Sequence, residues 1–412
     1  MRVGFVQRCE MNTLKIVAYK MPPQENWNAF RDPAQQNPNY ITDEQYALLK
    51  EAGFTHGIGL LEHGADIAVR ALALAEKYGL QYYVRDEINW ADILKKDFYY
   101  LNAENYRKYT GFSSFAGVYI HDEPNASKYP QLGEMVQGYY DFFQGAGEPL
   151  VNLLPTYANH IEQLGAKDYE DYIRKYIEKV PTRYVMYDHY PFRVRNDGTE
   201  VFNDDYLFNA SVVAKLCKEY GREMRTFVQA CNVDNVGAEF IDEMLWLQIH
   251  TCLAYGSRAI VYYYYWGDEL GKHDGLMDWF GKPQPIYYGA KKIHAQVQAY
   301  ADALCECAWQ ETLYLKGKKS HTNEVEFARF DCMENEVFSA EYDAIVGVFD
   351  YHGKKAYYAV NYVAPKSGLT NVFAFDLQGE YDVYVNGEKC TAVGKGVLAI
   401  PAGCAAFFLP KE

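Results

Sequence analysis

Short apolar runs alternate with longer segments of helical periodicity through the first three quarters of the chain. The runs are rich in β-branched and aromatic residues and have the length of strands. Eight of them stand out, and they begin near Leu14, Phe54, Leu80, Ala116, Pro149, Arg183, Arg225 and Arg258. Strand starts that lie 26 to 42 residues apart are typical of successive βα units.

The segments between these runs predict helices. The clearest cover residues 42–53, 65–79, 169–180, 207–221, 239–256 and 285–304. Thr42 has the position of an N-cap, and Gly53 and Gly79 have the positions of helix ends. Eight βα units predict a (β/α)8 barrel, a TIM barrel, which needs about 250 residues or more. A doubly wound sheet is the alternative, but residues 18–27 lack the glycine-rich loop expected after its first strand.

The pattern changes near residue 310, where short strand-like runs follow one another between turns that contain Gly, Asn and Lys. These runs cover 325–330, 344–351, 355–363, 371–377, 381–387 and 396–403. They predict a small antiparallel β-sandwich. We therefore expect a barrel over residues 1–309 and a C-terminal β-sandwich domain over 310–412. No linker separates the two parts, so we expect them to be docked rigidly.

Composition narrows the possible functions. The 412 residues carry a formal net charge of −15, which disfavours nucleic acid or an anionic membrane surface as the main partner. No apolar stretch is long enough to span a bilayer. The 39 tyrosines suit surfaces that pack and hydrogen-bond at once, such as sugar-binding surfaces. A homo-oligomer is a possible further partner.

Nine cysteines, an odd number without CxxC spacing, and a start without an apolar signal core predict a cytoplasmic protein with free thiols. His121 and His189 lack the spacing of metal ligands, so no metal and no cofactor is expected.

In a barrel of this kind, the reactive groups lie at the carboxyl ends of the strands. Two carboxyl groups, aromatic rings, amides and an arginine at one rim would suit a sugar site. Glu123, at the end of strand four, and Asp188, at the end of strand six, are the candidate catalytic carboxyl groups among these strand ends. The predicted substrate-binding residues are Arg85, Asp86, Asp122, His189, Tyr190, Gln229, Tyr264 and Trp266.

Two further expectations follow for the carboxyl groups. Neighbouring residues on a strand point to opposite faces, so only one of Asp122 and Glu123 should point into the site. A glutamate near apolar rings should have a raised pKa, which suits a proton donor.

Residues 117–125 (GVYIHDEPN) resemble the barrel-type glycoside hydrolases of the large retaining clan, in which an Asn-Glu-Pro or Asp-Glu-Pro carries the acid/base glutamate. Together with 185–192, 227–232 and 253–298, they resemble bacterial β-galactosidase-like or beta-glycosidase-like proteins over most of residues 80 to 300. The resemblance implies hydrolysis of a terminal glycosidic bond in a small carbohydrate.

One residue departs from that resemblance. The clan has its nucleophilic glutamate at the end of strand seven, where this chain has Gln229. Asp188 is the leading substitute, followed by Asp86, Glu87 and Asp268. The alternative is a non-catalytic carbohydrate-binding barrel that has lost the nucleophile. A sugar lyase or isomerase is a weaker third reading, because it would need a lysine or a metal cluster at the rim.

Overall fold

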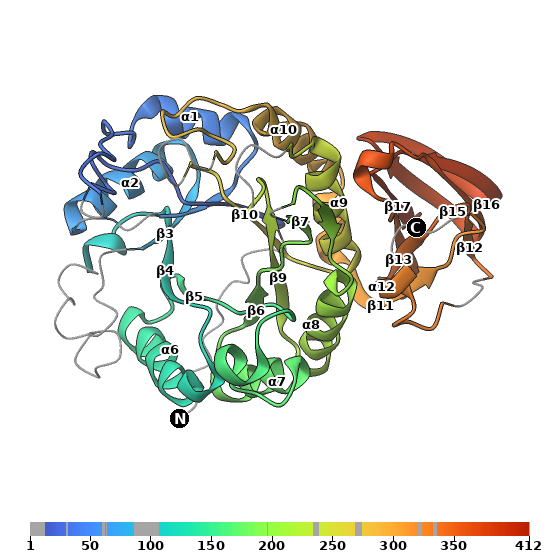
Figure 1. Ribbon diagram of the computed structural model, residues 1–412, viewed down its shortest axis with the longest axis horizontal. Coiled ribbons are helices and arrows are strands. Elements are labelled where there is room, and N and C mark those ends of the chain that lie inside the picture. Colours follow the sequence, from blue (N-terminus) through green and yellow to red (C-terminus); the bar gives the residue numbers. More distant parts are fainter. Residues whose placement is uncertain are drawn as a thin grey trace.

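The computed structural model describes residues 13–29, 32–59, 62, 64–85, 107–195, 197–233, 239–267, 274–319, 324–332 and 336–411. Within these residues, eight parallel strands form a barrel surrounded by helices, and an antiparallel β domain lies beside it (Figure 1). This arrangement confirms the predicted TIM barrel followed by a β-sandwich.

The barrel strands are hydrogen-bonded in the order β5-β4-β3-β2-β1-β10-β9-β6. A parallel bridge between Leu153 and Tyr187 joins the two outer strands of this order, β5 and β6, and closes the barrel. The eight strands match the eight predicted runs. They are β1 (Lys15–Tyr19), β2 (His56–Ile58), β3 (Gln81–Val84), β4 (Phe115–Asp122), β5 (Glu148–Asn152), β6 (Tyr184–Tyr187), β9 (Glu223–Gln229) and β10 (Ala259–Tyr263).

Helices cover the outside of the barrel (Figure 1). They include α1 (Asp43–Glu51), α2 (Ala65–Lys77), α6 (Tyr129–Phe143), α7 (Tyr169–Lys179), α8 (Tyr206–Tyr220), α9 (Asp242–Ala254), α10 (Pro285–Gln298) and α11 (Ala301–Glu306). Thr42 caps α1 as predicted, since its side chain accepts a hydrogen bond from the Gln45 amide. The sequence did not reveal α6, whose two glycines and many aromatic residues weaken the helical signal.

Paired charges fill the amino-terminal end of the barrel. The Glu148 carboxylate accepts hydrogen bonds from Lys15 (2.9 Å), Tyr83 (2.6 Å) and Arg225 (2.7 Å). Although burial opposes its charge, these cations hold the pKa of Glu148 well below its usual value. This network stabilises the end of the barrel opposite the predicted site.

The β domain is one folded sheet in the order β11-β13-β14-β17-β15-β12, with β16 paired to β15. Its strands are β11 (Ala308–Leu315), β12 (Phe338–Ala340), β13 (Ala344–Tyr351), β14 (Lys354–Asn361), β15 (Asn371–Val385), β16 (Glu388–Ile400) and β17 (Ala405–Pro410). Phe338 of β12, an end strand, contacts the rings of Tyr357 in β14 and Phe408 in β17, so this end of the sheet folds over its middle strands.

Two details of the β domain differ from the prediction. Residues 325–330 do not form a strand, because α12 (Glu324–Phe327) begins there and turns its buried face toward the barrel. The runs 371–377 and 381–387 are parts of one strand, β15, which a bulge bends between Asp376 and Glu380. The predicted boundary at 309/310 falls within β11.

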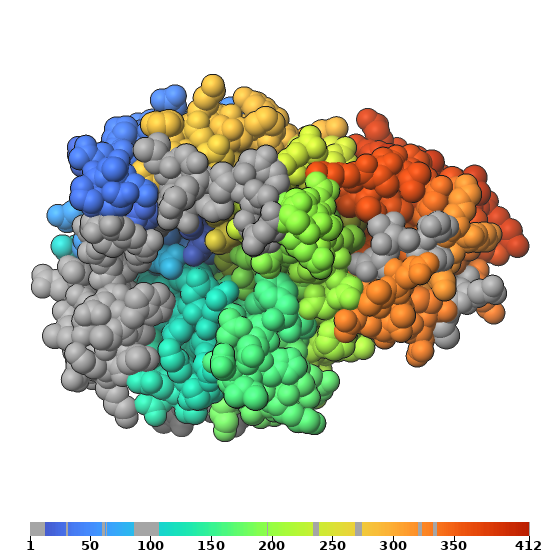
Figure 2. Space-filling model, viewed as in Figure 1, coloured from blue at the N-terminus to red at the C-terminus, as the bar shows by residue number. Residues whose placement is uncertain are grey.

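The two domains share a buried interface along α9 (Figures 1 and 2). A Cβ on Gly347 of β13 would lie 2.1 Å from the Ala254 carbonyl oxygen at the end of α9, so only glycine allows this approach. His250 of α9 is hydrogen-bonded to the Tyr358 hydroxyl at 2.8 Å. Within the described residues, no helix has both the length and the apolar character needed to cross a membrane.

Candidate active site

The carboxyl ends of the barrel strands bring charged and aromatic side chains together. We call this end the barrel mouth and define it by Lys20, Arg85, Asp122, Glu123 and Asp188. Four tyrosine rings lie among these residues, from Tyr19, Tyr119, Tyr190 and Tyr263. Glu123 and Asp188, predicted from distant parts of the sequence, are therefore neighbours.

The backbone at Glu123 explains how two adjacent carboxyl groups can face the same site. Glu123 has a φ of 50°, a left-handed conformation that is uncommon for residues other than glycine. Its amide donates to the Asn152 carbonyl at 2.9 Å, which anchors the turn to the next strand. Because β4 ends at Asp122, the strand alternation does not extend to Glu123, and both carboxyl groups lie near Asp188. The expectation that only one of them faces the site was therefore wrong.

Asp122 is held on the inner side of the mouth. Its carboxylate accepts hydrogen bonds from the Tyr119 hydroxyl (2.8 Å) and from the Asn152 amide (3.2 Å). The Tyr119 ring belongs to the apolar cluster inside the barrel. These two donors fix Asp122 as an acceptor beside Glu123 and Asp188.

Glu123 and Asp188 form the most perturbed carboxyl pair of the mouth. Burial, together with the charges of Glu123 and Asp122, raises the pKa of Asp188 well above its usual value. Burial and the neighbouring Asp122 also raise the pKa of Glu123, while a hydrogen bond with Asp188 partly offsets them. Because the two carboxyl groups are coupled, they titrate as a pair and retain a proton where an isolated carboxyl has lost it.

His189 lies behind Asp188 and is completely buried. Its Nε2 is hydrogen-bonded to Asp205 at 2.9 Å, and its ring packs against Tyr157 and Tyr206. The contacts of His189 are therefore with residues behind Asp188 and not with the residues that define the barrel mouth.

Two cations complete the mouth, and Arg85 lies near Asp122. Arg85 donates to the Tyr19 hydroxyl at 2.6 Å and stacks over the Tyr119 ring at 4.9 Å. Lys20 is buried, with its Nζ 4.4 Å from the centre of the Tyr264 ring, and it has a left-handed φ of 63°. Lys20 was not among the predicted site residues, although it directly follows the first strand, where reactive groups of such a barrel are expected.

Tyr190 and Tyr263 continue the aromatic lining, with ring centres 4.8 Å apart. Trp266 is different, because it has no exposed surface and its ring packs against Tyr40. In this state Trp266 offers no face for stacking on a sugar. Asp86, Glu87 and Asp268 lie outside the described residues.

The backbone engages the side chain of Gln229, the strand-seven residue. Its Oε1 accepts from the Phe192 amide at 2.8 Å, and its Nε2 donates to the carbonyls of Phe192 and Cys231, each at 3.0 Å. Gln229 thus ties the end of β9 to β7 (Phe192–Val194), which pairs with β8 (Glu200–Phe202) in a hairpin.

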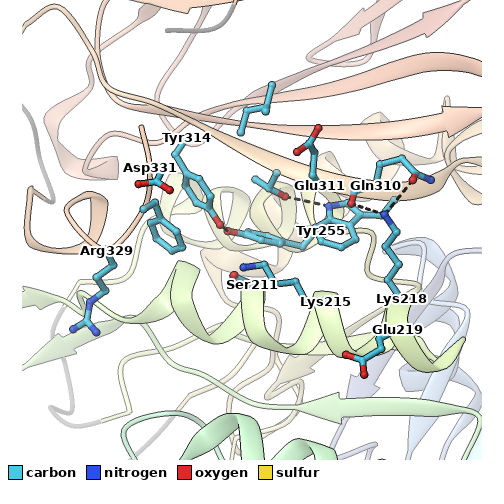
Figure 3. Close-up of a pocket in the computed structure, with 14 residues that line it drawn as sticks. Ser211, Lys215, Lys218, Glu219, Tyr255, Gln310, Glu311, Tyr314, Arg329 and Asp331 are labelled. Atoms are coloured by element: carbon cyan, nitrogen blue, oxygen red, sulfur yellow. Dashed lines mark hydrogen bonds between the residues drawn. The ribbon is translucent and has the colours of Figure 1, made fainter. Parts of the chain in front are cut away.

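A hollow of about 770 Å³ lies outside the barrel, along the seam between α8 and β11 (Figure 3). Its lining includes Tyr255, Tyr314, Trp309 and Lys218, and Lys218 donates to the Gln310 carbonyl at 2.9 Å. None of the predicted site residues lines this hollow. We therefore place the candidate active site at the barrel mouth.

Comparisons with known proteins place glycoside hydrolases among the matching structures. A β-galactosidase from Marinomonas ef1 is 10% identical with a TM-score of 0.49, over 72% of this chain and 62% of that one. A protein from Bacteroides thetaiotaomicron described as a candidate alpha-L-fucosidase is 16% identical with a TM-score of 0.45, over 62% and 88%. The family 1 β-glucosidase of Thermotoga maritima is 9% identical with a TM-score of 0.41, over 65% and 86%.

No protein-family profile and no curated protein sequence matches the chain. Since none of these three TM-scores reaches 0.5, we take function from the residues of the barrel mouth alone.

Proposed function

We propose that this chain is a glycoside hydrolase in which Glu123 protonates the glycosidic oxygen. The proposal is carried by the Glu123–Asp188 pair, whose pKa values are both raised at the carboxyl end of the barrel. A carboxyl group that keeps its proton beside tyrosine rings is the proton donor that glycoside hydrolysis needs.

In the proposed reaction, the Glu123 proton moves to the bridging oxygen while the bond from that oxygen to the anomeric carbon breaks. In the reactive form the pair holds one proton, on Glu123, which leaves Asp188 ionised; the Asp188 carboxylate then either bonds to the anomeric carbon or accepts a proton from the water that does. The two carboxyl groups lie about 5–5.5 Å apart in enzymes that retain the anomeric configuration and roughly 6.5–9.5 Å apart in enzymes that invert it. Glu123 and Asp188 lie near enough for each to shift the pKa of the other. Since Glu123 is exposed and Asp188 is buried, we propose that Glu123 turns away when the sugar enters.

The remaining mouth residues suit binding of a carbohydrate. Tyr190 and Tyr263 would pack on the apolar face of the ring, and Arg85 and Asp122 would hydrogen-bond to hydroxyls. His189 would act through Asp188, and Tyr264 through its contact with Lys20. The β-galactosidase-like specificity rests on the resemblance of residues 117–125 and their companions.

The test is hydrolysis of a panel of nitrophenyl glycosides by the wild type, Glu123→Gln and Asp188→Asn. We expect turnover by the wild type and a loss of 10²-fold or more in each variant. Glu178→Gln, an exposed substitution at the far end of α7, is the matched control and should keep full activity. Full activity of Glu123→Gln would overturn the proposal.

A carbohydrate-binding barrel without catalysis is the second candidate, and the position of Gln229 favours it. The Gln229 side chain is occupied by backbone groups, so the end of strand seven supplies no nucleophile. This candidate predicts sugar binding in calorimetry with no turnover of any glycoside on the panel.

A further inference from the structure

We propose that Glu326 of the β domain is a positioning residue for the barrel mouth. Glu326 accepts the hydrogen bond at the start of α8 that Asp205 would otherwise accept. Asp205 is then available to bond His189, which follows Asp188. The inference extends the proposed function, because it gives the β domain a part in shaping the site.

The starting point is an aspartate that does not cap its own helix. Asp205 occupies the N-cap position of α8, where an aspartate side chain normally accepts from the first amides of the helix. Its side chain makes no such bond here. Instead, Asp205 is bonded to His189 Nε2 at 2.9 Å and accepts from the Thr156 hydroxyl at 2.6 Å.

Glu326 supplies the cap from the other domain. Its Oε1 accepts a hydrogen bond of 2.5 Å from the Leu207 amide in the first turn of α8. Its Oε2 accepts from the Tyr362 hydroxyl, in the β domain, at 2.9 Å. The Glu326 side chain is completely buried between the domains. One carboxyl group thus joins α12, the β domain and the start of α8.

The same face of the β domain also supports the β7–β8 hairpin. The Tyr362 ring lies 5.4 Å from the Phe202 ring, which in turn stacks on Phe192 at 4.9 Å. Lys366 forms an ion pair of 2.5 Å with Glu200. The chain from Asp188 to Leu207 is therefore held by the β domain at the hairpin and at the helix start.

Removing Glu326 would leave the buried Leu207 amide without its acceptor, which destabilises the start of α8. Asp205 is the N-cap residue and lies within reach of that turn. If Asp205 turned to cap α8, it would release His189, which directly follows Asp188. Asp205 would then have two arrangements. Bonded to His189, it would hold the segment that carries Asp188; capping α8, it would leave that segment without this bond.

Charge makes this support sensitive to pH. Burial, with Asp204 and Asp205 nearby, raises the pKa of Glu326 to about 8, while hydrogen bonds from Leu207 and Tyr362 oppose the rise. Among the described residues, the phenols of Tyr255, Tyr314 and Tyr362 also lie near Glu326. Arg329, which follows α12, pairs with Asp204 at 3.6 Å. Above about pH 8, a charged Glu326 would repel Asp205 and weaken the support.

Hydrogen–deuterium exchange tests the proposal without requiring turnover. Wild type, Glu326→Ala and Glu326→Gln would be compared at pH 6.5 and pH 9, with intrinsic exchange rates corrected. Glu324→Gln, the exposed neighbour on α12, is the matched control. In Glu326→Ala, we expect residues 188–209 to exchange roughly tenfold faster at both pH values.

The glutamine variant separates the proposed role from general stability. Glu326→Gln keeps an acceptor and carries no charge, so its protection should not change with pH, whereas the wild type should lose protection at pH 9. Wild-type protection in Glu326→Ala, or equal loss of protection throughout the barrel, would overturn the proposal.

Turnover adds a separate readout. Glu326→Ala should lower kcat, with KM changed little, and Glu326→Gln should restore it. Because exchange is measured without substrate, an inactive wild type would contradict the proposed hydrolase while leaving the positioning role to be decided by exchange.

Discussion

At the scale of single residues, the chemistry of the mouth depends on one uncommon backbone conformation. Glu123 follows Asp122 directly, and its left-handed φ brings two neighbouring carboxyl groups to the buried Asp188. Burial and the negative charge of Asp122 raise the pKa of Glu123 and of Asp188. The sequence could locate Glu123 and Asp188 at strand ends, but it could not show that the alternation of β4 stops before Glu123.

Asp122→Asn tests this electrostatic coupling. The charge of Asp122 raises the pKa of Glu123, and the protonated form of Glu123 is the proposed donor. Activity is then present below this pKa and lost above it. Removing the negative charge lowers the pKa, so the alkaline limb of kcat/KM should move to lower pH. Asp141→Asn, an exposed change at the far end of α6, should leave the limb unchanged. If the alkaline limb of kcat/KM lies at the same pH in Asp122→Asn as in the wild type, the charge of Asp122 does not raise the pKa of Glu123.

At the scale of elements, periodicity and turn chemistry predicted the barrel strands because each run is short, apolar and bounded by turns. The hairpin between β15 and β16 was readable for the same reason, since Asn386 and Gly387 adopt the left-handed conformations that such turns require. The strand predicted for residues 325–330 was wrong. Their alternating pattern suggested a strand, but the contacts of Glu326 with the barrel decide their conformation, and such distant contacts leave no local signal.

The bonds of Gln229 to the β7–β8 hairpin give an element-scale prediction. In Gln229→Glu, a carboxylate would face the carbonyl oxygens of Phe192 and Cys231, which now accept from the amide. We expect the free energy of unfolding to fall by about 1–3 kcal/mol, with no gain in activity. Urea unfolding and the glycoside panel measure the two effects. Increased turnover in Gln229→Glu would instead show that strand seven can still supply a nucleophile.

At the scale of the whole molecule, burial of neutral histidines couples stability to pH. Burial lowers the pKa of His56 and His250 to about 3 and of His294 to about 4. In the unfolded chain, histidine takes up a proton near pH 6.5. The unfolded state therefore binds more protons between about pH 4 and 6.5, and stability is lost as the pH falls through this range.

Three such histidines contribute about 4 kcal/mol per pH unit to the slope of stability, and the carboxyl groups with raised pKa values, Glu326 and the Glu123–Asp188 pair, oppose it. His250→Gln should reduce the slope by about 1.4 kcal/mol per pH unit. Urea unfolding at intervals between pH 4.5 and 6.5 measures this change. The same slope in the wild type and the variant would mean that His250 is not neutral in the folded protein.

The most direct test of the central claim is the leaving-group dependence of Glu123→Gln. If Glu123 protonates the departing oxygen, its loss should matter little for aryl glycosides whose phenols leave without a proton. The deficit in kcat/KM relative to wild type should grow steadily as the pKa of the leaving phenol rises, reaching 10²-fold or more for poor leaving groups. A deficit of the same size for every leaving group would show that Glu123 does not donate the proton.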